Sequence, residues 1–272
     1  MHHHGAGIGV NSFLDLLSYA LPIVFIVGYL VMVNRSNKKY KKWPGTRIAF
    51  WIMGVLAVSL AIVGPIAELA HTSFVAHMIT HLLLGMLGPL LLVLAAPTTL
   101  LLRTVSVTSG RFLSKLLKNN YVQWVTHPVA ASFLNAGGLW ILYATDLYSL
   151  MHSSMWLFVL VHVHIFLAGY VFTLSIIYVE VTPHRTSFRL RAILLIMSMA
   201  AHGILSKWIY ANPPAGIDAA EAQQGGMLMY YGGDAIEIVL VIILCYQYFS
   251  RNRRTTNGSS ATVSIVKTTP EG

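Results

Sequence analysis

Residues 74–95 read FVAHMITHLLLGMLGPLLLVLA, and this stretch decides the fold because it is long and apolar enough to cross a lipid bilayer. It carries two histidines, His77 and His81, whose i, i+4 spacing places both imidazoles on one face of a helix. Burying a neutral imidazole in hydrocarbon without a partner costs on the order of a few kcal/mol. The pair therefore indicates either a metal site, since imidazole suits copper and zinc, or hydrogen bonds to a neighbouring helix.

The composition is that of a membrane protein. Hydrophobic residues make up 56% of the 272 residues and charged residues only 10%, whereas about 25% charged is usual in a soluble domain. The single cysteine, Cys245, excludes an intrachain disulfide, so a metal would be held by His, Met or carboxylate. The beginning, MHHHGAGIGVNS, lacks the basic region of a signal peptide, and we expect the first apolar segment to remain as a helix.

The apolar segments predict an all-α polytopic membrane protein, a bundle of seven transmembrane helices. Each segment has about the 20 residues that a bilayer crossing needs. An external histidine-containing tail (1–12) should precede the membrane domain (13–249), and a polar, disordered cytoplasmic tail (250–272) should follow it. The predicted helices lie near residues 13–33, 48–69, 74–95, 128–148, 156–178, 191–211 and 227–249.

The distribution of positive charge predicts the orientation. All but one of the 18 lysines and arginines lie in residues 34–47, 96–127, 179–191 and the tail, on alternate sides of the predicted helices. This places the N-terminus outside and the C-terminus in the cytoplasm, and it explains the net charge of +9 without nucleic-acid binding. Within 96–127, RFLSKLLKNNYVQWV is typical of either an interfacial helix against anionic lipid or a solvated connector.

Histidines from several predicted helices converge on one depth. At about 1.5 Å of rise per residue, they lie roughly 9–12 Å below the outer surface. All but His127 and His184 of the 12 histidines fall on the outer half. His162 and His164 are two residues apart and point about 200° apart, so only one of them should serve the same ion. The candidate metal ligands are His77, His81, His162 and His202, with His164 as the alternative to His162.

Further candidates surround this layer. Met227 and Met229 at the outer end of the last helix would suit cuprous copper, or pack in the core. Asp234 and Glu237 would orient an imidazole from outside the ligand set, or hydrogen-bond Lys207 or a tyrosine. His127 should pair with a loop carbonyl at the start of the fourth helix, where Pro128 fits the first turn. The remaining accessory histidines, either a metal-catching tail or a tag remnant, are His2, His3 and His4.

Four blocks of sequence resemble a known family: HMITHLLLGMLGPLLLVLAAPTTLLLR (77–103), HPVAASFLNAGGLWILYATDLY (127–148), HVHIFLAGYVF (162–172) and EAQQGGMLMYYGG (221–233). In this order, across roughly residues 50–250, they are similar to the CtaG-type cytochrome c oxidase assembly factors. The resemblance implies a seven-helix plasma-membrane protein of bacteria, with copper as cofactor or cargo. It also implies oxidase subunit I or other oxidase assembly proteins as partners.

By position, the resemblance places His77 and His81 on the family's paired histidines, His127 on its HP motif and His162 on its helix-five histidine. The chain departs at Val161, where many relatives have Glu before that histidine. If the Glu orients the metal ligand, His164 or Asp234 must take its place here.

Three functions remain open. The first is a non-enzymatic assembly factor that hands copper to an oxidase. The second is a b-type haem or quinone-linked redox protein, because histidines on separate helices can also clamp haem. The third is a metal-ion transporter, which would require polar groups in the cytoplasmic halves of the third, fifth and seventh helices, and these are almost purely apolar. No nucleophile–base–acid constellation is visible, and we expect no enzyme.

Overall fold

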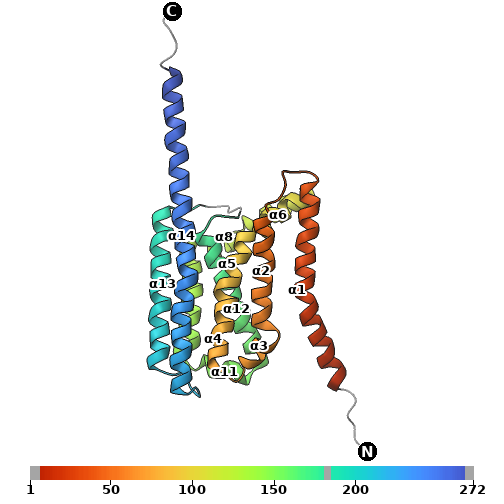
Figure 1. Ribbon diagram of the computed structural model, residues 1–272, viewed down its shortest axis with the longest axis vertical. Helices are drawn as coiled ribbons and strands as arrows, with labels where there is room; N and C mark the ends of the chain where they lie inside the picture. Colours follow the sequence, from red (N-terminus) through yellow and green to blue (C-terminus); the bar gives the residue numbers. More distant parts are fainter. Residues whose placement is uncertain (1–6, 181–184, 267–272) are drawn as a thin grey trace, which may run out of the picture.

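The computed structural model describes residues 7–180 and 185–266, with side chains for 19–180 and 185–250. Within these ranges the chain forms helices joined by turns and short loops, and it contains no strand. The long helices run side by side, and α14 extends beyond the bundle at the end opposite to the start of α1 (Figure 1). The predicted all-α class is confirmed.

The helices alternate between long straight rods and short connecting pieces. Two short π-helices, η1 and η2, interrupt otherwise α-helical stretches. The elements are α1 (Gly7–Asn37), α2 (Gly45–Ile62), α3 (Pro65–Leu69), α4 (Phe74–Leu82), η1 (Leu83–Leu87), α5 (Gly88–Ala95), α6 (Pro97–Thr104), α7 (Val107–Leu117), α8 (Asn120–Val125), α9 (Pro128–Ser132), η2 (Phe133–Gly137), α10 (Gly138–Ala144), α11 (Leu147–Ser153), α12 (Met155–Ile176), α13 (Phe188–Ala211) and α14 (Ala219–Val266).

Six helical stretches in the described ranges are long and apolar enough to cross a membrane, as a multi-pass membrane protein requires. The predicted span at 128–148 forms a shorter apolar helix, Pro128–Ala144, followed by Thr145 in an extended conformation. At about 1.5 Å per residue this helix is roughly 26 Å long, shorter than the ~30 Å hydrocarbon core. The six long stretches are Tyr19–Asn37, Gly45–Leu69, Phe74–Thr104, Met155–Ile176, Phe188–Ala211 and Ala219–Ser250.

Several predicted boundaries shift. The second predicted helix is broken between Ile62 and Pro65, because Gly64 adopts φ 92° and Pro65 has no N–H for a continuing helix. The last helix runs on to Val266 rather than ending near 249, and no proline follows Pro214 until Pro270. Residues 1–6 and 267–272 of the predicted tails lie outside the described residues, so the division of the chain into these three parts stays a prediction.

The π-helix η1 forms next to a proline, and it shapes the interior. Pro89 has no N–H for the carbonyl of Gly85, and Gly88 instead donates to Leu83, five residues back. The Gly85 carbonyl lies directly against Gly169 of α12, where a Cβ would overlap it. The helix α12 therefore approaches closely at the level of the buried histidines.

The core surrounds the histidines on the α4–α11 side of the bundle. One cluster of buried side chains includes Phe74, Met78, Tyr143, Leu205 and Met229. A second cluster, with Leu90 and Leu195 at its centre, fills the opposite half of the bundle. Helices α13 and α14 pack along each other, as do α2 and α5. The three buried histidines, His77, His81 and His202, thus lie in the interior between packed helices.

Candidate functional site

Both histidines of α4 are inside the bundle. The side chains of His77 and His81 are 2% and 3% exposed, and the N-cap Ser73 and the Glu221 carboxylate hold the beginning of this helix. The structure separates the two imidazoles into different surroundings, an outer group around His77 and an inner group around His81.

The inner group pairs α4 with α13. The rings of His81 and His202 have centroids 6.2 Å apart and an interplanar angle of 28°. Among the described residues, none of the four ring nitrogens has a hydrogen-bond partner. Two buried imidazoles with free nitrogens are rare, because an unsatisfied buried polar group costs about 1–3 kcal/mol. The four nitrogens can therefore bind a water, an ion or another small ligand.

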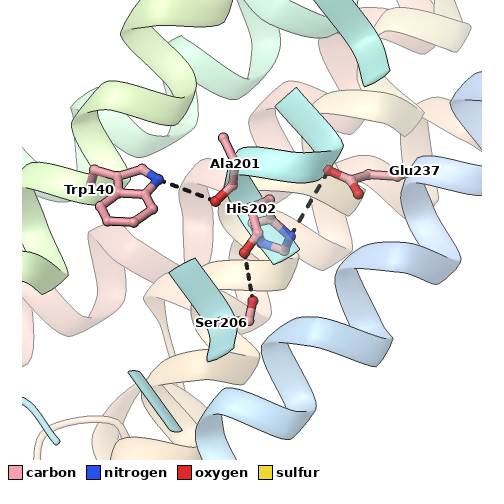
Figure 2. Close-up of polar contacts among 5 residues, drawn as sticks. All are labelled: Trp140, Ala201, His202, Ser206 and Glu237. Carbon is pink, nitrogen blue, oxygen red and sulfur yellow. Dashed lines mark hydrogen bonds and ion pairs between the residues drawn. The ribbon is translucent and has the colours of Figure 1, made fainter. Parts of the chain in front are cut away.

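Glu237 of α14 lies beside this pair. Its Oε1 is 4.0 Å from His202 Nδ1, while Oε2 has no hydrogen-bond partner in the described part of the chain (Figure 2). The ring of His202 lies so close to Gly233 that any Cβ there would overlap it. On the other side of α13, Trp140 Nε1 donates to the Ala201 carbonyl at 3.2 Å, and the Ser206 hydroxyl donates to the His202 carbonyl at 2.9 Å (Figure 2). These bonds hold the turn of α13 that carries His202.

A cavity of about 20 Å³ opens between these side chains. This is room for a single water or ion. Its lining brings together α4, α12, α13 and α14 with η2, which supplies Asn135. The polar side chains that line it are His81, Asn135, Trp140, His164, Ser198, His202 and Glu237.

The outer group joins α4 to α10 and α12. His77 Nε2 is 3.0 Å from the Tyr143 hydroxyl, and the His77 ring centroid lies 6.2 Å from that of His162 and 6.4 Å from that of His152. His162 Nδ1 is 2.8 Å from the Phe158 carbonyl, which can only accept, so the proton resides on Nδ1. The same holds for His152 Nδ1 and the Tyr148 carbonyl at 2.9 Å. Both rings therefore keep Nε2 as a free lone pair.

His164 belongs to the inner group rather than the outer one. Its Nε2 donates to the Leu134 carbonyl of η2 at 3.2 Å, and its ring lies against Gly138, where a Cβ would overlap it. His162 instead contacts His77. The i, i+2 spacing thus sends the two imidazoles to different groups.

The predicted single layer of ligands is not formed as one cluster. Within the described residues, no group of three or more His, Cys, Asp or Glu side chains could hold one metal ion. The chain instead brings His81 to His202 and His77 to His162. A depth deduced from helix rise says nothing about lateral separation, which the helix crossings determine.

Several other candidates lie apart from both groups. Met227 is 46% exposed, whereas Met229 is fully buried in the apolar core, so the two do not form a thioether pair. The carboxylate beside an imidazole is Glu237, and Asp234 is half-buried without a described hydrogen bond to a histidine. Lys207 lies over the Tyr230 ring at 5.1 Å and does not pair with Glu237.

Two further predictions concern the accessory histidines. Pro128 is in the first turn of α9 as expected, but His127 does not pair with a loop carbonyl. Its Nδ1 accepts the Val129 N–H at 3.4 Å, because the orphan groups at a helix N-terminus are donors. His2, His3 and His4 lie outside the described residues.

The residues that the sequence analysis missed come mainly from the segment 133–152. Tyr143, Trp140, Asn135 and His152 all contact one of the two groups. Asn135 lies in η2, Trp140 and Tyr143 lie in α10 and His152 lies in α11, so these residues come from three successive elements and not from one regular helix. The clustering of tyrosine, tryptophan and asparagine in an apolar segment is the signal that could have identified them.

Comparison with known proteins identifies a family whose profile matches most of the chain. The profile described as cytochrome c oxidase caa3 assembly factor (Caa3_CtaG) matches residues 27–251, which include both histidine groups. No solved structure matches this chain.

Similar sequences occur in mycobacteria. An uncharacterized protein of Mycobacterium leprae is 27% identical over 262 residues, 88% of this chain and 40% of its own length. An uncharacterized protein of Mycobacterium bovis is 29% identical over 195 residues, 69% of this chain and 30% of its own length. This chain thus spans less than half of either relative. Because the family profile covers most of the chain and nearly all of its helices, the protein belongs to the caa3-type cytochrome c oxidase assembly factor family.

Proposed function

We propose that this protein is a non-enzymatic membrane assembly factor that binds cuprous copper between His81 and His202 and passes it to subunit I of a haem-copper oxidase. The observation that carries the proposal is the pair of buried imidazoles, whose four nitrogens have no hydrogen bond in the described part of the chain, beside a cavity of about 20 Å³. Membership in an oxidase assembly family supports the choice of client.

The ligand set suits transient binding. Two imidazoles can hold copper, and the absence of a third His, Cys, Asp or Glu ligand in the described ranges leaves the ion less tightly enclosed than in a closed tetrahedral zinc site. Glu237, at 4.0 Å from His202 Nδ1, would fix the orientation of that ring. A donor must release its cargo, so an incomplete ligand set is an advantage here.

The outer group provides a route to this pair. His152 is exposed and His162 is half-buried, and each keeps a free Nε2. His77 follows one helical turn before His81 on α4. We propose that copper from outside contacts His152, His162 and His77 in turn before it reaches His81.

This route assumes the orientation that the positive charges favour, with the N-terminus outside and the C-terminus in the cytoplasm of a bacterial plasma membrane. It also assumes that Pro128–Ala144 crosses as a short seventh span. Local thinning of the bilayer accommodates a span of this length.

The alternatives differ in what the inner cavity must hold. A b-type haem between His81 and His202 would require α4 and α13 to separate widely, because the cavity of about 20 Å³ is far smaller than a macrocycle. Purified protein with a strong Soret band would favour that function, whereas cuprous protein is colourless. A transporter would need a continuous polar path through the bundle, and metal uptake into vesicles that contain the purified protein would favour that function.

The decisive experiment is deletion of the gene in a host with no second copy. We expect subunit I to be made and inserted while oxidase turnover and membrane copper both fall. Excess copper in the medium should partly restore turnover by mass action. Normal turnover with normal copper content in the deletion strain refutes the assembly role.

A further inference from the structure

A basic groove runs along α7 and α8, far from either histidine group in the chain. The groove is open, with a volume of about 770 Å³. Arg111 and Lys115 line it one turn apart on α7, and Lys118 lines it from the C-cap of the same helix, together with Ser114 and Asn119. The turn between the helices is held by Asn119 Oδ1, which accepts the Tyr121 N–H at 2.9 Å. The three cations are therefore presented by an ordered scaffold.

No acidic side chain balances these cations. The sequence contains no Asp or Glu between Glu68 and Asp146. In the described part of the chain, none of the three has an ion pair or a cation–π contact. Arg103, by contrast, lies over the Trp43 ring at 5.0 Å. The positive charge of the groove is thus not neutralised by any other described side chain.

Large apolar side chains stand exposed next to the groove. Phe112 and Leu116, one helical turn apart on α7, are 71% and 49% exposed. On α8, Tyr121 and Trp124 are 72% and 62% exposed. The two helices occupy the chain between Thr104, where a long apolar span ends, and Pro128, where the next apolar helix begins. Figure 1 places α6 and α8 at the end of the bundle where α1 finishes.

We propose that this groove binds the phosphate headgroup of an anionic phospholipid, with Phe112 and Trp124 inserted at the boundary of the acyl chains. Three unpaired cations beside exposed aromatic side chains are the combination that an anionic membrane surface recognises. An acidic soluble protein would use the charge but would leave Phe112, Leu116 and Trp124 in water.

The test compares lipid retention by two charge variants. The full-length protein is reconstituted in nanodiscs of phosphatidylcholine with phosphatidylglycerol, and the phosphatidylglycerol retained after extraction is counted by native mass spectrometry. We expect R111Q/K115Q/K118Q to lose roughly fivefold in preference for each cation removed. The matched control K38Q/K39Q/K41Q removes the same charge from another loop and should retain the wild-type preference.

Equal losses in both variants would show a general charge effect and overturn the site, as would unchanged retention in R111Q/K115Q/K118Q. Retention of an acidic soluble protein with no preference among lipids would also overturn it. If R111Q/K115Q/K118Q fails to insert into the membrane, the salt dependence of lipid binding by the wild-type protein tests the proposal instead. Its preference for phosphatidylglycerol must fall when NaCl rises from about 0.05 M to about 1 M, and a preference independent of salt contradicts the proposal.

Discussion

At the scale of single residues, His81 and His202 are distinguished among the described histidines because both rings are buried and neither nitrogen of either ring is hydrogen-bonded. His77, His152, His162 and His164 each have a hydrogen-bond partner, either a hydroxyl or a backbone carbonyl. A hydrogen bond already satisfies a buried nitrogen, so the two unpartnered rings are the ones with most to gain from a ligand.

We expect His81→Ala and His202→Ala each to weaken Cu(I) binding by at least about 100-fold, because each removes half of a two-imidazole site. His77→Ala should lower copper loading less, since it removes only a step of the route. The measurement is competition of purified protein with a colorimetric Cu(I) chelator under reducing conditions. His127→Ala, exposed and outside both groups, is the matched control. Unchanged affinity in both inner variants would rule out this pair as the copper site.

Glu237→Gln tests whether the carboxylate orients His202. The change preserves shape and removes charge, and we expect Cu(I) affinity to fall about 10-fold with the fold intact. The same chelator competition measures it, and circular dichroism checks the helix content. Asp234→Asn, one turn away on α14, should leave affinity unchanged. A larger loss of Cu(I) affinity in Asp234→Asn than in Glu237→Gln would show that Asp234, and not Glu237, orients His202.

At the scale of elements, close packing between helices restricts which residues fit around the inner cavity. In η2 and its junction with α10, two adjacent glycines have different surroundings. A Cβ at Gly138 would overlap the His164 ring, whereas a Cβ at Gly137 meets nothing within 4 Å. Gly138 therefore serves packing and Gly137 does not.

Gly138→Ala should destabilise the protein by about 1–3 kcal/mol, because His164 must move in a packed interior. Gly137→Ala should be neutral or stabilising by up to about 1 kcal/mol, because alanine favours helix. Thermal unfolding in detergent, followed by circular dichroism, compares the two variants. Equal Tm values would contradict the close packing of His164 against Gly138.

The motif LAAPTT is another element whose role the structure explains. Ala96 adopts φ 55°, and α6 then begins with Pro97 in its first turn. Glu180, 4% exposed and distant in sequence, accepts hydrogen bonds from Thr98 N at 2.7 Å and Thr99 N at 2.9 Å. A negative charge at a helix N-terminus satisfies its orphan N–H groups and complements the helix dipole. This motif therefore stabilises the turn after α5, not the histidine groups.

At the scale of the whole molecule, the number of membrane crossings rests on Pro128–Ala144. Cysteine labelling can decide it, because Cys245 is the single native cysteine. In a Cys245→Ser background, Ser149→Cys in α11 should react with an impermeant maleimide added outside. Thr108→Cys in α7 should react only after the membrane is opened, since α7 belongs to the positively charged side. Labelling of both positions from the same side would show that this helix does not cross.

The sequence alone determined the helical class, the position of the long apolar segments and the histidines to be considered. These follow from local properties, since hydropathy over about 20 residues and spacing along one helix need no knowledge of neighbours. The same is true of His77 and His81 sharing α4, and of Glu237 as a candidate partner of an imidazole.

Only the tertiary structure decided which of these residues meet. His81 lies beside His202, and the Tyr143 ring contacts both His81 and His77. At the same level α12 approaches closely, because Gly85 and Gly169 carry no side chain. Tyr143 and Trp140, three residues apart on α10, reach the outer group and the inner cavity respectively. Contacts between helices depend on crossing angles, close approaches and turns of irregular pitch, and none of these is readable from the depth of a residue along its own helix.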